Sequence, residues 1–291
     1  MMRVLGLGLV LIFGCSSKKE APASTTPKPQ ITHFQAVSVA GLTAEQQSGF
    51  VKLVNDEICP CNCPQSFAAC LDTCKPATLL ARWIIERLKE GVPMELMAPA
   101  LSQEINSGFS SNPQIIDLEG FSSKGSVKAP FTVIEFADFE CAHCKTTAQS
   151  LDAFLKKYPK EIRLVYKHFP LEAHPFAKGA GLAAEAAGMQ GKFWPMHQAL
   201  FESNTPLDGP QIMALAQKIG LNPARFKQDL SNSKVIARVE HSLREGQLLG
   251  ITGTPALFFN GRPYYLSTDI KGLELRLAME KARAQATCDK L

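Results

Sequence analysis

A Cys-x-x-Cys pair, Cys141 and Cys144, stands where an apolar segment gives way to a helical pattern. Residues 131–137 before it are rich in β-branched and aromatic side chains, which predicts a buried strand. Residues 145–158 after it repeat apolar side chains at helical spacing, so Cys141 lies at a helix N-terminus. Unpaired backbone N–H groups and the helix dipole stabilise an anion at that end. The sequence therefore predicts that Cys141 is the attacking thiolate and that Cys144, one turn further in, is the resolving thiol.

His143 lies between the two sulfurs, where it can add a positive charge or a hydrogen bond to the thiolate. A Cys-x-x-Cys pair can also be half of a zinc site or a structural disulfide of an exported protein. No second Cys-x-x-Cys pair or paired histidine follows nearby to complete four zinc ligands. A dithiol between a strand and a helix is typical of a redox-active pair. We therefore expect thiol chemistry that needs no metal and no organic cofactor.

Several segments along the second part of the chain carry a family resemblance. They are the dithiol block at 135–144, Tyr166-Lys-His-Phe-Pro-Leu171, residues 190–197, and Gly253-Thr254-Pro255. Over roughly residues 113–287 the chain resembles the DsbA-like branch of the thioredoxin superfamily. The resemblance implies an α/β thioredoxin fold with a helical insertion at about 174–249. It also implies a cis peptide bond between Thr254 and Pro255 that faces the dithiol and presents backbone groups to a substrate peptide.

Glu135 lies six residues before Cys141, on the strand predicted to be buried. A buried carboxylate is costly unless it is paired or protonated. The family resemblance implies that Glu135 takes the proton from Cys144, and Lys167 on the neighbouring strand is its candidate charge partner. The alternative interpretation is a surface glutamate at the sheet edge.

The first fourteen residues are a charged tip followed by a short apolar run, which is typical of a secretory signal peptide. Ile12-Phe13-Gly14-Cys15 resembles a bacterial lipobox, which implies cleavage before Cys15 and lipidation of that residue; the alternative is cleavage without lipid. Residues 15–39 are then the lipidated cysteine and a Pro-rich flexible tether. We expect the protein to be held by its lipid anchor at a membrane of the bacterial cell envelope. There it would face the periplasm or another oxidising extracytoplasmic space.

Residues 40–112 are predicted to form a small all-α domain with a cysteine-rich loop. Cysteines two residues apart form strained bridges, so pairing between the first three and the next two is expected. The last cysteine, close to the C-terminus, is the expected partner of the one that remains. A soft-metal thiolate site and a second redox-active thiol relay are the alternatives. The cysteines concerned are Cys59, Cys61, Cys63, Cys70, Cys74 and Cys288.

Residues 113–291 are predicted to form the thioredoxin domain, beginning with a strand or hairpin arm at 114–118. Apolar residues make up 45% of the 291, enough for two modest cores. The formal net charge of +4 is small and scattered, so nucleic-acid binding is not expected.

The sequence thus predicts an extracytoplasmic thiol–disulfide oxidoreductase that uses a Cys-Ala-His-Cys dithiol, and a disulfide-forming oxidase is favoured. Its expected partners are exported proteins with cysteine thiols and a membrane redox partner. Ala142 stands where the strongest DsbA-type oxidants commonly have proline, so a disulfide reductase or isomerase stays open. The cysteine-rich loop faintly resembles that of cytochrome c maturation proteins of the CcmH type, which leaves a thiol-reducing role in that process. A metal-handling lipoprotein is the remaining alternative.

Overall fold

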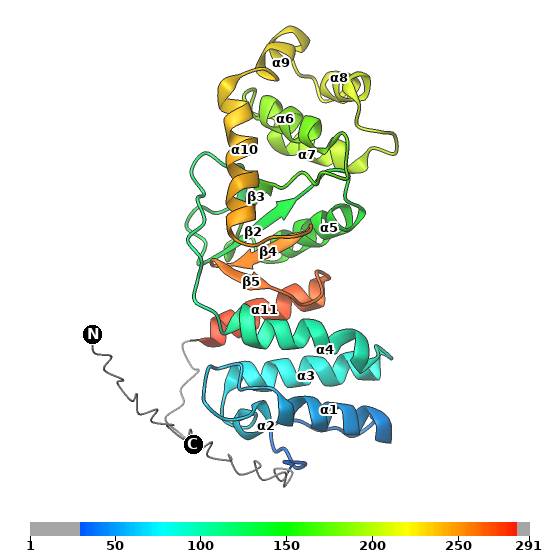
Figure 1. Ribbon diagram of the computed structural model, residues 1–291, viewed down its shortest axis with the longest axis vertical. Coiled ribbons are helices and arrows are strands. Elements are labelled where there is room, and N and C mark those ends of the chain that lie inside the picture. Colours follow the sequence, from blue (N-terminus) through cyan, green and yellow to red (C-terminus); the bar gives the residue numbers. More distant parts are fainter. Residues whose placement is uncertain (1–29, 284–291) are drawn as a thin grey trace, which may run out of the picture. The chain divides into compact units, whose positions relative to one another are not determined.

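The computed structural model describes residues 30–283 (Figure 1). The predicted signal peptide at 1–14, the predicted lipid attachment at Cys15, most of the predicted tether and Cys288 lie outside the described residues. The described residues from Ile31 onward belong to one compact unit. Within the described part of the chain, no helix is both long enough and apolar enough to cross a bilayer.

A five-stranded mixed sheet forms the centre of the catalytic region, with the strand order β1-β3-β2-β4-β5. The central strand β2 pairs in parallel with β3 and antiparallel with β4, while β1 and β5 form the two edges. The apolar composition of β2 follows from this position, because its neighbours and the helices enclose it. The bounds are β1 (Ser123–Gly125), β2 (Phe131–Ala137), β3 (Ile162–His168), β4 (Ala256–Phe259) and β5 (Arg262–Tyr264).

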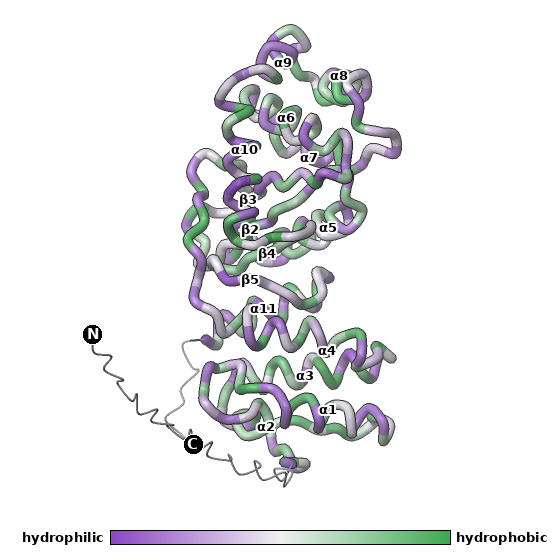
Figure 2. The backbone as a smooth tube through the Cα atoms, viewed as in Figure 1, coloured by the Kyte–Doolittle hydropathy of each residue, from purple (hydrophilic) through white to green (hydrophobic). Residues whose placement is uncertain are grey.

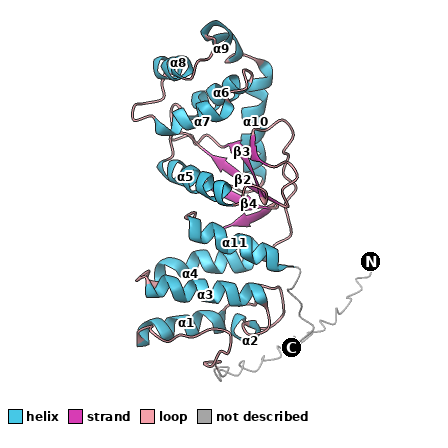
Figure 3. Ribbon diagram, turned by 180° about the vertical axis from the view of Figure 1, so that it is seen from behind, coloured by secondary structure: helices cyan, strands magenta, loops and turns pink. Residues whose placement is uncertain are grey.

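Helices cover both faces of this sheet (Figure 3). Helices α5 (Ala142–Lys157) and α11 (Ile270–Ala282) pack on one face, where Val133 and Leu257 are buried. Helix α10 (Ser233–Leu248) packs on the other face, over Phe136. Gly246 permits this approach, since a Cβ atom there would lie 2.5 Å from the ring of Phe169. Alternate residues of β2 therefore serve two separate cores.

A block of helices, α6 to α10, is inserted between β3 and β4 and lies over the dithiol end of the sheet. Alanines of α6 pack at full burial, which lets neighbouring helices approach closely. This confirms the predicted fold class, a thioredoxin fold with a helical insertion. The bounds not yet given are α6 (Ala177–Gly188), α7 (Phe193–Glu202), α8 (Gly209–Lys218) and α9 (Pro223–Asp229).

The N-terminal region is helical, as the sequence predicts, and α3 packs against α11 of the catalytic region. Figure 2 shows hydrophobic and hydrophilic residues alternating along α1 and α3, as expected for helices that bury one side. Thr43 and Gln46 form a capping box at the start of α1. The bounds are α1 (Ala44–Asp56), α2 (Phe67–Cys70), α3 (Lys75–Lys89), α4 (Met94–Gln103) and the π-helix η1 (Glu104–Phe109).

Residues 31–36, which the sequence analysis assigns to the tether, are hydrogen-bonded to the helical region. The Ile31 amide donates to the Asn55 side chain, and the amides of Gln35 and Ala36 donate to the Asp72 carboxylate. The ring of Phe34 also packs edge-on against Phe50 of α1. This short segment is therefore part of the packed structure.

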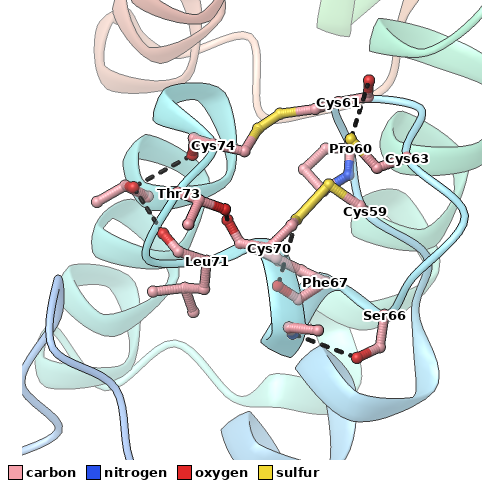
Figure 4. The surroundings of a disulfide bond; sticks show 12 residues. Cys59, Pro60, Cys61, Cys63, Ser66, Phe67, Cys70, Leu71, Thr73 and Cys74 are labelled. Carbon is pink, nitrogen blue, oxygen red and sulfur yellow. Dashed lines mark hydrogen bonds between the residues drawn. A yellow bond between two sulfur atoms is a disulfide. The ribbon is translucent and has the colours of Figure 1, made fainter. Parts of the chain in front are cut away.

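Two disulfides close the loop between α1 and α3 (Figure 4). Cys59 is bonded to Cys70, and Cys61 is bonded to Cys74 at the N-terminus of α3. Cys63 is not a free cysteine either. All five cysteines are buried, so this loop has a small core made largely of sulfur.

The strand expected at 114–118 does not form, and this prediction is wrong. The edge strand β1 forms instead at Ser123–Gly125, where it pairs with β3. The apolar residues at 115–118 suggested a strand, but Ile115 is almost fully exposed and the segment only follows the sheet edge. Its backbone is held by a bond from the Gln114 amide to the Gly261 carbonyl and by bonds of the Asp117 backbone to the Glu245 and Lys167 side chains, not by a strand ladder.

Candidate active site

The dithiol lies at the junction between β2 and α5, under the inserted helices. Cys141 is the N-cap residue of α5, and its sulfur accepts a hydrogen bond of 3.3 Å from the backbone N–H of Cys144. A bond of 3.2 Å from the Cys141 amide to the Asp138 carbonyl closes the turn that leads into the helix. Cys141 retains 7% of its exposure whereas Cys144 has none. The outer sulfur is therefore the one that a substrate can reach.

The peptide bond between Thr254 and Pro255 is cis and precedes β4. The thiol of Cys141 donates to the carbonyl oxygen of Thr254 at 3.4 Å. Because β4 pairs with β2, this loop is fixed beside the dithiol although it comes more than a hundred residues later. The two elements that the sequence singled out thus meet in one site.

The two thiols have opposite acidities. The pKa of Cys141 is lowered to about 5, first by the hydrogen bond from the Cys144 thiol, then by the Thr254 side chain and the backbone N–H groups of Cys144 and His143. The pKa of Cys144 is raised, because the shared proton stays on the inner sulfur and because that sulfur is buried. The site therefore holds one thiolate and one thiol at neutral pH.

The side chain of His143 is exposed at the start of α5. The contribution of this residue to the acidity of Cys141 comes from its backbone N–H group. Any residue except proline can supply that group, so the position matters here through the helix terminus.

Glu135 is buried on β2, and its Oε1 atom has no hydrogen-bond partner among the described residues. Burial raises the pKa of this carboxyl group to about 8, and the negative charges of Asp152 and Cys141 act in the same direction. Lys124 opposes them. Glu135 in turn contributes to the raised pKa of Cys144. A carboxyl group that is protonated near neutral pH thus lies close enough to the inner thiol to influence its ionisation.

Lys167 is not the charge partner of Glu135, and this prediction is wrong. In the parallel pairing of β2 with β3, Glu135 is opposite Tyr166, so Lys167 is on the other face of the sheet. Its ammonium group binds Glu245 at 2.6 Å and the Asp117 carbonyl at 2.7 Å. The cation near Glu135 is Lys124 of β1, which forms a 2.7 Å ion pair with Asp152 of α5.

The buried Asp138 and the half-buried His174 support the dithiol turn, and neither was a predicted site residue. The Asp138 carboxylate accepts from the Glu140 and Leu171 amides and from His174 Nδ1, each at 2.8 Å. The hydrogen bond to Asp138 raises the pKa of His174, and the charge of Cys141 adds to this effect. The Asp-Phe-Glu-Cys sequence carried the only available signal for Asp138; His174 carried none.

A sequence model of thioredoxin matches residues 120–277, which is more than half of the chain. The chain belongs to the thioredoxin family. A thioredoxin-like oxidoreductase from Silicibacter pomeroyi has 25% sequence identity and a TM-score of 0.51, over 57% of this chain and 94% of that one. BdbD from Bacillus subtilis has 23% identity and a TM-score of 0.50, over 61% of this chain and 97% of that one. The chain thus has a thioredoxin-family domain in which the dithiol lies at the N-terminus of α5 beside a cis-proline.

Curated relatives match part of this chain and are much longer proteins. Na(+)/H(+) antiporter NhaA 1 of Salinispora arenicola is 32% identical over 195 residues, which are 67% of this chain and 30% of the relative. Na(+)/H(+) antiporter NhaA 1 of Mycolicibacterium gilvum is 34% identical over 166 residues, 55% of this chain and 27% of the relative. The chain thus spans less than a third of the length of these relatives.

Two clefts of about 310 Å³ each lie at the dithiol and at the cis-proline of this thioredoxin-family chain. One is lined by Cys141 itself together with Phe139, Phe201 and Pro206. The other is lined by Gly253, Pro255 and residues of β4 and β5. A polypeptide joined to Cys141 therefore has a cleft at its cysteine, and a second cleft begins at the cis-proline.

The second group of sulfur atoms lies in the N-terminal loop. The Sγ atoms of Cys59, Cys61 and Cys74 lie within 4.8 Å of one another although they belong to two disulfides. Sulfur in a disulfide is not a thiolate ligand, so these residues fit a soft metal ion only after reduction. Among the described residues, Cys141 and Cys144 are the free cysteines.

Proposed function

We propose that this chain is an extracytoplasmic oxidase that introduces disulfides into exported proteins. The observation that carries the proposal is the lowered pKa of Cys141 beside the cis-proline loop. A stabilised thiolate favours the reduced enzyme, and an enzyme whose reduced form is stable is an oxidant of its substrates.

In the proposed reaction, a substrate thiolate attacks Cys141 Sγ of the Cys141–Cys144 disulfide. A bond forms between substrate and Cys141, the enzyme disulfide breaks, and Cys144 leaves with the electron pair. A second substrate thiolate then attacks the substrate sulfur of the mixed disulfide, and Cys141 leaves as a stable thiolate. Two substrate thiols become one disulfide, and the enzyme disulfide becomes a thiol and a thiolate.

In this scheme Glu135 exchanges a proton with Cys144, which is the leaving group when the enzyme disulfide opens and the nucleophile when it closes. When Cys144 leaves, its high pKa requires a proton, and a neutral Glu135 carboxyl group can supply it. In the reverse direction the carboxylate accepts that proton. Thr254 and Pro255 hold the substrate peptide beside Cys141 through their backbone groups.

The proposal includes the cellular setting. Lipidation at Cys15 would hold the enzyme on a membrane of the cell envelope, where substrates arrive unfolded and with reduced thiols. A membrane redox partner would return the Cys141–Cys144 pair to its disulfide form, because every turnover leaves the enzyme reduced.

A redox titration of the 141/144 pair against glutathione tests the direction of electron flow. We expect a potential of about −180 mV or higher, which is the range of disulfide-forming and isomerising enzymes. A potential near −270 mV, as in cytosolic thioredoxin, would instead assign a reductase role. Isomerase activity would be seen as reactivation of a protein with scrambled disulfides without added oxidant.

A metal-handling role is the second candidate, and the three clustered sulfur atoms in the N-terminal loop favour it. Metal analysis of protein purified under reducing conditions separates the two. A tightly bound ion that is lost in the Cys61→Ser variant would support metal handling. Intact disulfides and no bound ion would exclude metal handling and assign the N-terminal loop a structural role.

A further inference from the structure

A groove of about 380 Å³ lies between the N-terminal helices and the loop that joins β5 to α11. Its walls include Trp83 of α3, Leu96 and Leu101 of α4, and Tyr265 and Leu266 of the loop. Leu96 is 74% exposed, although the helix that carries it packs against the rest of the region. The groove therefore has apolar side chains that are accessible to a partner.

This groove meets the cleft beside the cis-proline. Tyr265 lines both, and the cis-proline cleft also contains Gly253 and Pro255. The groove and the cis-proline cleft therefore adjoin at Tyr265. We call this surface, defined by Trp83, Leu96, Leu101, Tyr265 and Leu266, the α4 groove.

The loop that carries Tyr265 is fixed by a hydrogen bond to a buried carboxylate. The Tyr265 amide donates to Glu104 Oε2 at 2.8 Å, and the Glu104 carboxylate is itself paired with the buried Arg276. The Tyr265 side chain nevertheless stays 36% exposed. The backbone is thus fixed while the ring remains accessible, which lowers the entropy lost when a partner binds.

Trp83 has a polar group, its indole N–H, in addition to the apolar ring that lines the groove. The residue is 9% exposed, and its indole Nε1 has no hydrogen-bond partner among residues 30–283. Buried indole N–H groups usually have an acceptor. The Nε1 atom is buried, so it is the ring of Trp83, together with the leucines of the same groove, that suits the apolar side chains of an extended polypeptide.

We propose that the α4 groove binds an extended segment of the substrate polypeptide while the substrate cysteine is joined to Cys141. This inference rests on the proposed function. Helices α3 and α4 lie before residue 120, where the match to the thioredoxin family begins. The N-terminal helices would then give this chain a preference for long unfolded substrates over small thiols such as glutathione, which has no apolar side chain to place in the groove.

A kinetic comparison tests the preference. The Leu96→Asp variant is assayed with an unfolded peptide of about thirty residues that has one cysteine and several leucines, and with glutathione. We expect the ratio of the peptide rate to the glutathione rate to fall about tenfold, because one apolar contact is replaced by a charge. Ile115→Asp is the matched control, since Ile115 is 98% exposed and lines neither cleft. An unchanged ratio in Leu96→Asp would overturn the proposal.

A crosslinking experiment separates this proposal from the proposed function. The same peptide is coupled chemically through a disulfide to Cys141 of a Cys144→Ala variant, so that no turnover is required. A photoreactive residue at position 96 should then crosslink to the peptide, and one at position 115 should not. Crosslinking at neither position, or equally at both, would exclude the α4 groove even if the enzyme is an active oxidase. A crosslink at 96 alone would support the groove even if the measured potential is that of a reductase.

Discussion

The sulfur of Cys141 lies 3.4 Å from the carbonyl oxygen of Thr254, although 113 residues separate them in the sequence. This contact joins the helix terminus that stabilises the thiolate to the cis-proline loop that would hold the substrate peptide. Because β4 pairs with β2 in register, the sheet fixes both partners and leaves neither to a flexible loop. The chemical and the binding parts of the site are therefore positioned by one structural element.

The reduced enzyme should titrate as one thiolate and one thiol. With a Cys141 pKa of about 5 and a raised Cys144 pKa, thiolate absorbance at 240 nm should rise around pH 5 by the amount expected for one sulfur. The second thiol should remain protonated above pH 9. An absorbance titration of reduced protein checks both expectations.

The Cys144→Ala variant is the control for that titration. The hydrogen bond from Cys144 is the largest cause of the low Cys141 pKa, so its removal should move the midpoint to higher pH. A wild-type midpoint near 9, the ordinary value of a cysteine, would contradict the assignment of Cys141 as the attacking thiolate.

The buried carboxyl group of Glu135 should make the oxidised protein less stable as pH rises. With both thiols free its folded pKa is about 8, and burial, the largest cause, acts in the oxidised protein too, so between the ordinary value of 4.5 and the raised folded pKa the folded state binds more protons than the unfolded state. The free energy of unfolding therefore falls across this window and is restored on acidification. Glu135→Gln should remove the effect and be the more stable protein at pH 8, by at most about 5 kcal/mol. Urea unfolding at pH 5 and pH 8 measures the difference.

Glu135→Gln should also remove the pH dependence near 8 from the rate at which Cys144 resolves a mixed disulfide. Lys167→Met is the matched comparison, because Lys167 is buried next to the same strand but on the opposite face. Stopped-flow measurements should show an altered profile in the first variant and the wild-type profile in the second. The same profile in both would exclude a proton relay through Glu135.

The parts of the site that the sequence predicts are those with a local cause. Cys141 follows an apolar strand and precedes a helical pattern, and these neighbours alone place it at the helix terminus where the structure has it. The fold class and the insertion between β3 and β4 follow from motifs in the right order. Local sequence is sufficient here because the strand, the turn and the helix are consecutive.

The parts that the sequence could not predict depend on which face a side chain occupies. Lys167 was expected beside Glu135 because both lie on neighbouring strands, but the register pairs Glu135 with Tyr166 instead. His174 reaches Asp138 across 36 residues through a loop without a motif. The strand expected at 114–118 had the apolar composition of a strand, but the backbone of Asp117 is bound by the Glu245 and Lys167 side chains in place of a strand ladder. Register and loop paths are set by tertiary packing, which a single sequence does not display.

The two N-terminal disulfides should stabilise the helical region. Cys59 and Cys70 are 11 residues apart, and a bridge over so short a loop contributes about 3 kcal/mol. The Cys59→Ala/Cys70→Ala double variant should have a free energy of unfolding that is lower by that amount, and urea unfolding measures it. In the presence of a strong reductant the difference between variant and wild type should disappear. A difference that persists under reduction would show that the cavity left by the two sulfurs, and not the bridge, is the cause.

The buried ion pair of Arg276 with Glu104 should hold the N-terminal helices to the catalytic region. Arg276 of α11 is fully buried and binds Glu104 of η1 as well as Glu280 at 2.9 Å. Arg276→Met should lower the free energy of unfolding by about 3–5 kcal/mol, because it leaves a buried carboxylate without its cation. Adding Glu104→Gln should restore part of this loss, since the orphaned charge is removed. Urea unfolding of the single and double variants checks both steps. If the double variant is as unstable as the single one, packing of the arginine stem, and not the ion pair, stabilises this contact.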